Sequence, residues 1–443
     1  MNPSIDRLIR KQLIDDENSC ENSSPTPQLD DLVKPSMIRA RNKSKRRLTI
    51  TSMDGPGACS PKSENDLDPD RGLIHGIDSS TLKSASPLFR GRRRWSVGTE
   101  TDGHRRESFC DKQTTHKGHK FCPSASGVGY ACKKGLKPVS PNQDSFMLIR
   151  IEGGMSVYGV FDGHGKVGHD VSNFCKDQIA KILFGNPDFI NGSDIPAALK
   201  NAFLECQSRL ERETRAGRLD ASSSGTTATV VVHTVESIFV AHVGDSRCIL
   251  ASRNGGRVVE LTMDHKPNLP GERERIIANG GVVIKPPADV NHRVYVKNQK
   301  FPGLAMSRAL GDLVGYFSAG ISAEPDVRVI RMESGLIPAV KRAHTESENS
   351  VDMSEFDLLL ICSDGVWEFI TNEECAEIAM NFPQGREMRA AEALCKESWD
   401  RWIREENGYI VDDITALVVS LNSRSRDRKS EQGRFEQAAE DTE

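Results

Sequence analysis

The stretch VYGVFDGHGKVG, residues 157–168, is the most informative part of the sequence. Its first part, residues 157–161, is almost entirely apolar, and it changes at once to Asp162, Gly163 and His164. A short apolar run bounded by aspartate and glycine is typical of a buried β-strand that ends in a turn. The stretch therefore predicts a strand that presents polar side chains at its end.

Similar runs continue along the chain. The clearest are SFMLIRIEGG (145–154), GTTATVVVHT (225–234), ESIFVAHVGDS (236–246), RCILASRNGG (247–256), FDLLLICSDG (356–365) and ITALVVSL (414–421). Between them, apolar residues recur at helical spacing in 171–183 and 199–210. A helix is predicted to begin at Thr371, where Glu374 completes a capping box, and another to span 386–403. Strands interrupted by helix pairs favour an α+β fold with packed antiparallel sheets and the helices outside.

The two ends of the chain differ from its centre. Residues 1–118 are rich in serine, proline and charged residues, show no helical or strand period, and have more basic than acidic side chains. We expect them to form a disordered basic tail. Residues 119–422 are then one folded domain, and residues 423–443 a disordered charged C-terminal tail.

The composition excludes several classes of protein. Eleven cysteines are scattered without any C-x-x-C pair, which argues against a disulfide framework or a zinc finger and favours a reducing compartment. No apolar stretch is long enough to span a membrane. We expect a soluble cytoplasmic monomer with no specific nucleic-acid partner. The basic run 34–47 is read as a solvated charge run, a nuclear-import signal or an anionic docking patch.

The basic tail repeats one short pattern. Two arginines, a spacer and a hydroxyl residue form RRLT, RRWS and RRES, which end at Thr49, Ser96 and Ser108. Basophilic kinases favour this arrangement, and a disordered segment can lie extended in a kinase cleft. We therefore expect such a kinase to phosphorylate the tail.

Four aspartates lie at the ends of predicted strands: Asp162, Asp245, Asp364 and Asp412. One Asp-Gly after a strand is usually only a turn, but several carboxylates held in this way suit hard divalent cations, which prefer oxygen ligands. The imidazole of His164 could be a metal ligand, a turn residue or a general acid for a departing oxygen. We favour the general acid, because carboxylates and water already satisfy such cations.

Nine ordered strings extend this pattern over nearly all of residues 121–422. They are PNQDSF, VYGVFDGHGKVG, SSGTTATVVV, VAHVGDSRCIL, LTMDHKPNLPGERERIIANGGVV, LAMSRALGD, AEPDV, LLICSDGVWEFI and VDDITALVV. With these strings the chain resembles the type 2C protein phosphatases of the metal-dependent (PPM) family.

The resemblance implies a four-layer α/β/β/α sandwich, with two central antiparallel β-sheets flanked by helix pairs and two Mn²⁺ or Mg²⁺ ions at one edge. Asp162 would bridge both ions, Gly163 would offer its carbonyl to one, and Asp364 and Asp412 would hold the other. The implied reaction is hydrolysis of phosphoserine and phosphothreonine in phosphoproteins by attack of a metal-bridging hydroxide, with His164 protonating the leaving oxygen.

The resemblance also implies Asp144 in the metal-binding set, and Asp245 and Glu368 at a weaker third ion. Trp367 and the segment 308–312 are expected to stabilise the domain, and Gly225 with its two following threonines to shape a strand near the site. The segment 286–323 resembles the family's variable flap, where substrate choice is expected to lie.

Two positions depart from the family pattern. Gln143 stands where many members have an acidic residue, and Val139 where they have a phosphate-binding arginine. Lys137 or Lys134 could replace that arginine as a point charge, without its bidentate fork. These departures keep open a catalytically inactive relative that docks phosphoproteins. A different two-metal hydrolase, such as a nuclease, would normally offer several histidine ligands, which this sequence lacks near its motifs.

Overall fold

The structure is a computed structural model. It describes residues 93–100, 113–118, 122–137, 141–151, 154–253, 256–287, 289–331 and 355–421. All of these belong to one compact unit, Gly72–Glu443. Thr49, Ser108 and Val139 lie outside the described residues, so what the sequence predicts for them stays a prediction.

The larger sheet has seven strands, and every neighbouring pair is antiparallel. Its order is β16 (Asp326–Arg331), β9 (Ser237–Val243), β8 (Ala228–His233), β5 (Ser156–Phe161), β4 (Ser145–Ile151), β1 (Arg93–Glu100) and β2 (Gln113–Gly118). Along β5, Val157 and Phe161 face the helices, whereas Tyr158 and Val160 face the second sheet. Burial on both faces explains why this strand is a continuous apolar run in the sequence.

The second sheet has five antiparallel strands. Its order is β11 (Val258–Glu260), β10 (Arg247–Ala251), β17 (Leu358–Cys362), β18 (Ile414–Ser420) and β3 (Val128–Lys133). Its inner face packs on the larger sheet through residues such as Leu359 and Leu417, and its outer face forms a second core that includes Trp367. The packing role expected for Trp367 is what the structure shows.

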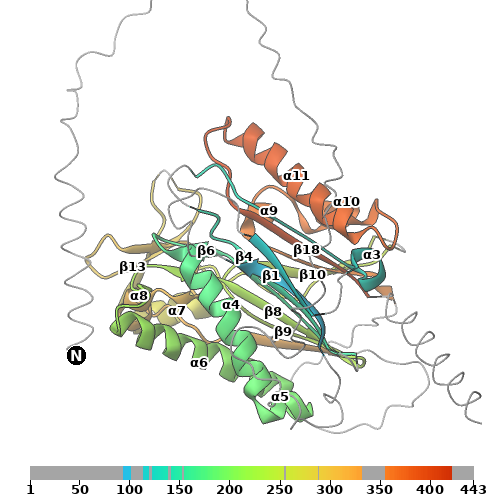
Figure 1. Cartoon of the computed structure of the whole chain (residues 1–443). Helices are drawn as coiled ribbons and strands as arrows, with labels where there is room; N and C mark the ends of the chain where they lie inside the picture. Colours follow the sequence, from blue (N-terminus) through green and yellow to red (C-terminus); the bar gives the residue numbers. More distant parts are fainter. Residues whose placement is uncertain are drawn as a thin grey trace, which may run out of the picture. The chain divides into compact units, whose positions relative to one another are not determined.

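Helices cover the outer face of each sheet (Figure 1). On the larger sheet these are α4 (Gly168–Gly185), α5 (Pro187–Asn191) and α6 (Ile195–Arg215), and on the smaller sheet α9 (Asp364–Trp367), α10 (Asn372–Met380) and α11 (Glu387–Glu405). The capping box predicted at Thr371 and Glu374 is confirmed at the start of α10. The predicted sandwich of two antiparallel sheets between helices is therefore confirmed. Within the described residues, no helix combines the length and the hydrophobicity needed to cross a membrane.

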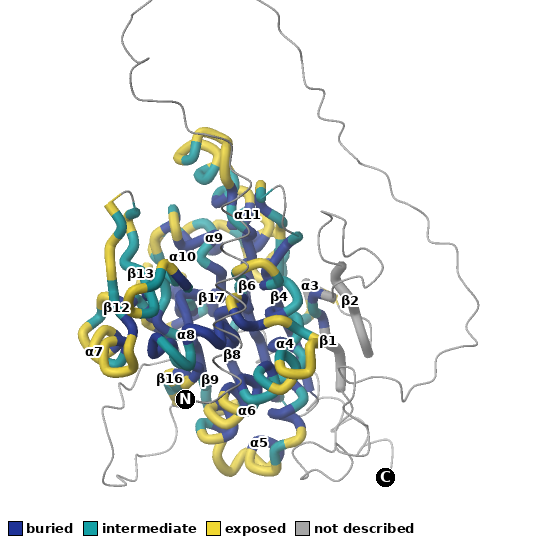
Figure 2. Tube along the Cα trace, turned by 90° about the vertical axis from the view of Figure 1, so that its left-hand side faces the viewer, coloured by how far each residue is buried: buried dark blue, intermediate teal, exposed yellow. Residues whose placement is uncertain are grey.

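Two small sheets complete the domain. The first is β12 (Gly281–Ile284), β13 (Arg293–Val296) and β14 (Pro302–Leu304), which contacts α7 (Pro270–Ala278) and α8 (Leu313–Ser318). Of these, β13, β14 and α8 lie within the predicted flap 286–323, and α7 and β12 directly precede it. The second is β15 (Leu310–Gly311), β7 (Gly225–Thr226) and β6 (Gly163–His164). A short helix, α3 (Pro123–Ser126), precedes β3. Figure 2 shows that the strands at the centre are buried, whereas α7 is largely exposed.

Strands β1 and β2 lie before residue 119, in the segment that the sequence predicts to be a disordered tail. β1 pairs with β4 on one side and with β2 on the other, and the side chains of Val97 and Thr99 are 2% and 1% exposed. The prediction is wrong here because β1 has few apolar residues and depends on its ladder with β4, which local sequence does not reveal. Ser96, one of the three expected kinase sites, therefore lies in a strand paired on both sides.

Candidate active site

The acidic residues at the strand ends lie together. Asp162 follows β5 of the larger sheet, Asp364 follows β17, and Asp412 precedes β18 of the smaller sheet. Asp162 and Asp364 lie close enough to perturb each other's ionisation, and the charges of Asp412 and Asp144 act on both of them. We call these four residues the carboxylate cluster. It forms where strand ends of both sheets converge.

The carboxylate cluster holds its protons strongly. Burial, reinforced by neighbouring aspartates, raises the pKa of Asp364 to about 8 and that of Asp144 to about 7. Burial and the charge of Asp364 likewise raise the pKa of Asp162 well above its usual range. One carboxylate oxygen of Asp144 and one of Asp364 are buried without a hydrogen-bond partner. The negative charges of these crowded oxygens are not fully compensated by the protein. Divalent cations, which prefer oxygen ligands, would compensate them.

Asp412 and its neighbour Asp413 have different surroundings. Asp413 is 2% exposed, and its two oxygens accept N–H groups from Gly135 at 2.7 Å and from Gln143 at 2.8 Å. Asp412 accepts the backbone N–H of Asp413 at 2.7 Å and pairs with Lys137. Asp413 therefore fastens two loops to the start of β18, and its charge acts on Asp144, whereas the charge of Asp412 acts on Asp162 and Asp364.

Lys137 brings a positive charge to the cluster. Burial disfavours its ammonium, but the ion pair with Asp412 and the charges of Asp162 and Asp413 outweigh burial and raise its pKa. The ammonium of Lys134 binds the backbone carbonyls of Gly135 and Lys137 at 3.2 and 3.0 Å. Lys137, considered as a substitute for the missing arginine, thus pairs with Asp412 of the cluster.

The turn after β5 is too crowded for a side chain at Gly163. A Cβ there would lie 2.3 Å from the carbonyl oxygen of Gly168 and 2.6 Å from that of Gln143. The Gln143 side-chain amide donates to the carbonyl oxygen of Gly165 at 2.6 Å. An acidic residue could not donate this hydrogen bond, so the amide at position 143 has a structural task in the turn.

The partner of His164 is Asp312, which lies in a segment predicted to have only a stabilising role. His164 Nε2 and Asp312 Oδ2 are 2.7 Å apart, and His164 Nδ1 is buried without a hydrogen-bond partner. Burial opposes the charged imidazole, but the charge and hydrogen bond of Asp312 outweigh it and raise the pKa of His164. The sequence did contain a signal, because Gly311-Asp312 repeats the Gly-Asp pair that follows β9, Gly244-Asp245.

The sheet of β6, β7 and β15 holds this pair in place. Gly225 in β7 lies opposite His164 on one side and Gly311 on the other. A Cβ at Gly225 would lie 2.1 Å from Asp312 Oδ2 and 2.8 Å from His164 Nε2. Glycine at this position therefore leaves the space that the His164 and Asp312 side chains occupy, consistent with the strand-shaping role expected for it.

Asp245 and Glu368, expected at a third ion, are placed differently. Asp245 is 4% exposed, and its Oδ2 lies 2.6 Å from Lys266 Nζ, while its Oδ1 is buried without a hydrogen-bond partner. Its charge acts on Asp364. Glu368 is exposed and donates its backbone N–H to the carbonyl oxygen of Asp364 at 2.9 Å. Among the described residues, no hydrogen bond or ion pair joins the Glu368 side chain to the cluster.

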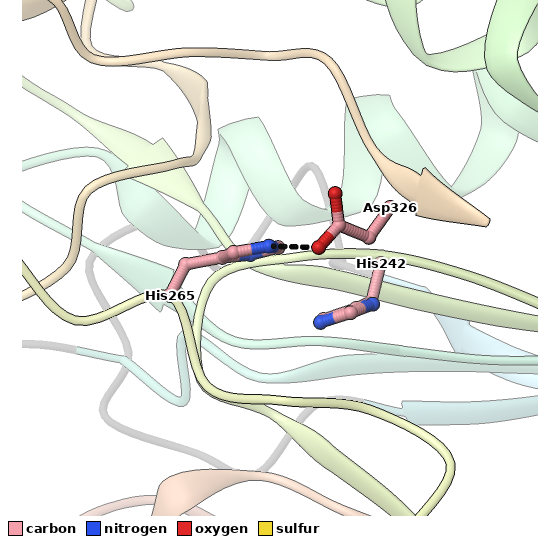
Figure 3. A group of neighbouring side chains, drawn as sticks. All are labelled: His242, His265 and Asp326. Atoms are coloured by element: carbon pink, nitrogen blue, oxygen red, sulfur yellow. Dashed lines mark hydrogen bonds and ion pairs between the residues drawn. The ribbon is translucent and has the colours of Figure 1, made fainter. Parts of the chain in front are cut away.

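A second group of metal-binding residue types, not foreseen from the sequence, consists of His242, His265 and Asp326. We call it the His-His-Asp group. Figure 3 shows the ring of His265 directed at Asp326, with the ring of His242 beside it. The two rings stack with centroids 4.5 Å apart. His265 Nε2 lies 3.2 Å from Asp326 Oδ2, and its Nδ1 accepts the N–H of Gly244 at 3.1 Å. Both ring nitrogens of His265 are thus already engaged.

The other members of the His-His-Asp group are also engaged. His242 Nε2 lies 2.9 Å from the carbonyl oxygen of Met263. Burial and the neighbouring His265 lower the pKa of His242 to about 4. Arg308 donates to Asp326 Oδ1 at 2.7 Å and also pairs with Glu272. Arg308 therefore has the stabilising role expected for it, and the group does not need a metal ion to satisfy its polar atoms.

Comparisons with known proteins agree with this geometry. The family model "Protein phosphatase 2C" matches residues 144–335. "Probable protein phosphatase 2C 35" of Arabidopsis thaliana is 30% identical over 327 residues, which cover 67% of this chain and 84% of the relative. "Probable protein phosphatase 2C 48" of Oryza sativa subsp. japonica is 33% identical over 316 residues, with 66% and 82% covered.

The fold is also found in a solved structure of the same description. The crystal structure of serine-threonine phosphatase 2C from Toxoplasma gondii superposes with a TM-score of 0.54 at 21% identity, over 66% of this chain and 94% of that one. Sequence relatives, fold and the convergence of strand-end aspartates lead to one conclusion. The chain belongs to the protein phosphatase 2C family and is a metal-dependent serine/threonine protein phosphatase.

Proposed function

We propose that this chain hydrolyses phosphoserine and phosphothreonine in proteins with two divalent cations, Mn²⁺ or Mg²⁺, held by Asp162, the Gly163 carbonyl, Asp364 and Asp412. One observation carries the proposal: buried carboxylates from both sheets crowd together with raised pKa values and unpartnered oxygens. When bound, the cations would activate the attacking water and neutralise charge on the phosphoryl oxygens. Asp144 would support the site, with its Oδ2 held by the Ser363 hydroxyl at 2.8 Å.

His164 would give a proton to the leaving serine or threonine oxygen. Because Asp312 engages Nε2, the nitrogen left for the substrate is Nδ1, which has no hydrogen-bond partner. An imidazolium held in this way can donate its Nδ1 proton, while the second proton stays on Nε2 and remains hydrogen-bonded to the Asp312 carboxylate. Asp312 would thus be a positioning residue that fixes the ring and stabilises its charged form.

Two lysines would set the charge balance around the cluster. Lys137 would contact a phosphoryl oxygen as a point charge, from its place beside Asp412. Lys266 neutralises Asp245 at 2.6 Å. A third cation would have to displace the Lys266 ammonium, so we expect any third site, with Asp245 and Glu368, to be the weakest.

The test is turnover of a phosphoserine peptide by the full chain with Mn²⁺, with Mg²⁺ and with excess chelator. We expect no turnover in chelator, and a loss of at least about 1,000-fold for Asp162→Asn, since a cation contributes several kcal/mol to the transition state. Asp400→Asn, the same change at a side chain that is 51% exposed on α11, is the matched control and should keep full activity. Full turnover in chelator would contradict the proposal.

Three further expectations stay predictions. Phosphorylation of Thr49 or Ser108 by a basophilic kinase is measured as phosphate incorporation in the full chain. Ser96 should be the poorest of the three sites, because its backbone is paired on both sides within β1. The monomeric state is measured by sedimentation. We expect a cytoplasmic location, and the basic run 34–47 suggests nuclear import in addition. Imaging of the chain with and without that run tests both.

A further inference from the structure

Three large apolar side chains are exposed next to the carboxylate cluster. Leu136 is 39% exposed, Tyr409 82% and Ile410 50%. They come from two segments joined by a hydrogen bond from the Leu136 N–H to the Val411 carbonyl oxygen at 2.8 Å. Leu136 directly precedes Lys137, which pairs with Asp412, and Ile410 lies two residues before Asp412. We call Leu136, Tyr409 and Ile410 the apolar rim.

The apolar rim stands on a fixed base. Gly135 donates its N–H to Asp413 at 2.7 Å, and a Cβ on Gly135 would lie 2.1 Å from the Val411 carbonyl oxygen. Val411 itself is fully buried, at 0% exposure. The backbone of both segments is therefore packed and hydrogen-bonded, while three of the side chains are left in water. Figure 2 shows the segment that follows α11 as exposed.

The position of the rim decides what can cover it. Because the rim residues stand one to three positions from Lys137 or Asp412 in the chain, a polypeptide that brings a phosphorylated residue to those two side chains also comes near the rim. An extended chain advances by about 3.3–3.6 Å per residue, so Ile410 is within about 7 Å of Asp412 along the backbone. A side chain on the rim would therefore belong to a residue within about three positions of the phosphorylated one. Burial of apolar area is favourable, and tyrosine is prominent among side chains that dominate binding.

We propose that the apolar rim is a subsite for a bulky apolar side chain of the phosphoprotein substrate, located within about three residues of the phosphoserine or phosphothreonine. This rests on the proposed function of the carboxylate cluster. It adds a second specificity region, on the side of β18, to the flap around β12, β13 and β14.

The experiment compares two phosphoserine peptides that differ only near the phosphorylated residue, one with leucine or phenylalanine at flanking positions and one with glycine there. The full chain, Tyr409→Ser/Ile410→Ser and Leu136→Ser are measured with Mn²⁺. We expect the full chain to prefer the apolar peptide. The double variant should lower the ratio of the two kcat/KM values about tenfold, mainly through KM, and Leu136→Ser about threefold.

Val235→Ser is the matched control. Val235 is also exposed, at 41%, but it follows β8, whose end pairs with the start of β5 and thus lies far from Asp162. Its ratio should equal that of the unchanged chain. Exposed positions rarely contribute much to folding, and unchanged thermal unfolding checks this for each variant.

Three results would overturn the proposal. A peptide ratio unaltered in the double variant would remove the subsite. If the double variant had a higher kcat/KM on both peptides by the same factor, another segment of this chain would cover the rim. If the double variant differed from the unchanged chain only in its oligomeric state by sedimentation, a second copy of the chain would cover it. Failure of the proposed function looks different, because Asp162→Asn would then retain turnover of both peptides.

Discussion

The carboxylate cluster and the His-His-Asp group both consist of residue types that can bind metal ions, but their polar atoms are in opposite conditions. In the cluster, oxygens of Asp144 and Asp364 are buried without partners, and the pKa values of both carboxyls are raised. In the His-His-Asp group, both nitrogens of His265 are engaged, and the pKa of Asp326 is lowered, first by its hydrogen bond to His265 and then by Arg308.

The difference shows how a functional site can be told from a structural network. In natural proteins nearly all buried polar atoms have hydrogen-bond partners. A buried group of like charges without such partners therefore indicates that the group binds a ligand of opposite charge. A group whose atoms already bind one another needs no such ligand. Residue types alone would have ranked the His-His-Asp group as the better metal site, because it has two histidines.

The largest expected effect is a contrast between two aspartates. Asp364→Asn should reduce turnover by at least about 1,000-fold, because it removes a cation ligand, whereas Asp326→Asn should cost less than about tenfold. Mn²⁺ should raise the thermal midpoint of the unchanged chain and of Asp326→Asn, but much less that of Asp364→Asn. If Asp326→Asn abolished the rise of the thermal midpoint in Mn²⁺, the His-His-Asp group would bind the cation and the contrast between the two regions would be wrong.

The second expected effect sharpens the roles of the histidines. His164→Gln and Asp312→Asn should each slow hydrolysis of a phosphoserine peptide by about 100-fold, but slow an aryl phosphate by less than about tenfold, since its leaving oxygen needs little protonation. His265→Gln is the matched control and should affect both substrates equally. Equal losses on both substrates in the His164 variant would remove the general-acid assignment.

The smallest expected effect concerns pH and has opposite signs in the two regions. The pKa of His242 is lowered to about 4, so its neutral form stabilises the fold above the ordinary histidine pKa of about 6.5, and this contribution is lost as the pH falls toward 4. In chelator, the raised pKa values of Asp144 and Asp364, about 7 and 8, do the reverse. Their contribution is complete below about pH 4 and is lost as the pH rises through 7 to 8.

Denaturant unfolding between pH 5 and pH 8 checks both signs. From pH 7 to pH 5, the free energy of unfolding of the unchanged chain should fall by about 2 kcal/mol more than that of His242→Gln. From pH 5 to pH 8 in chelator, the free energy of unfolding of the unchanged chain should fall more than that of Asp364→Asn. Mn²⁺ should remove this difference. A His242 variant with the same pH profile as the unchanged chain would contradict the first part.

The sequence could predict those features that depend on neighbouring residues. Asp162, Asp364 and Asp412 stand at the ends of apolar strands, and a strand followed by a turn is a local pattern. The helix start at Thr371 is local too, because its capping box spans only four residues.

Features that depend on distant pairing could not be predicted. Asp312 meets His164 only because β15 pairs with β7 and β7 with β6. Strand β1 exists because β4 offers it an edge, and its own sequence has too few apolar residues to reveal it. The apolar rim likewise joins residues 136 and 409–410, whose proximity depends on the bond to Val411.

The separation between His164 and Asp312 has a consequence for synthesis of the protein. The two residues are 148 positions apart in the chain, and Asp412 lies near the end of the last strand ladder. In a chain emerging from the ribosome, His164 is therefore synthesised long before its partner Asp312, and Asp162 long before Asp364 and Asp412. Domains tend to fold as units, N-terminal parts first. The nascent phosphatase should thus be catalytically silent until nearly the whole domain has been made.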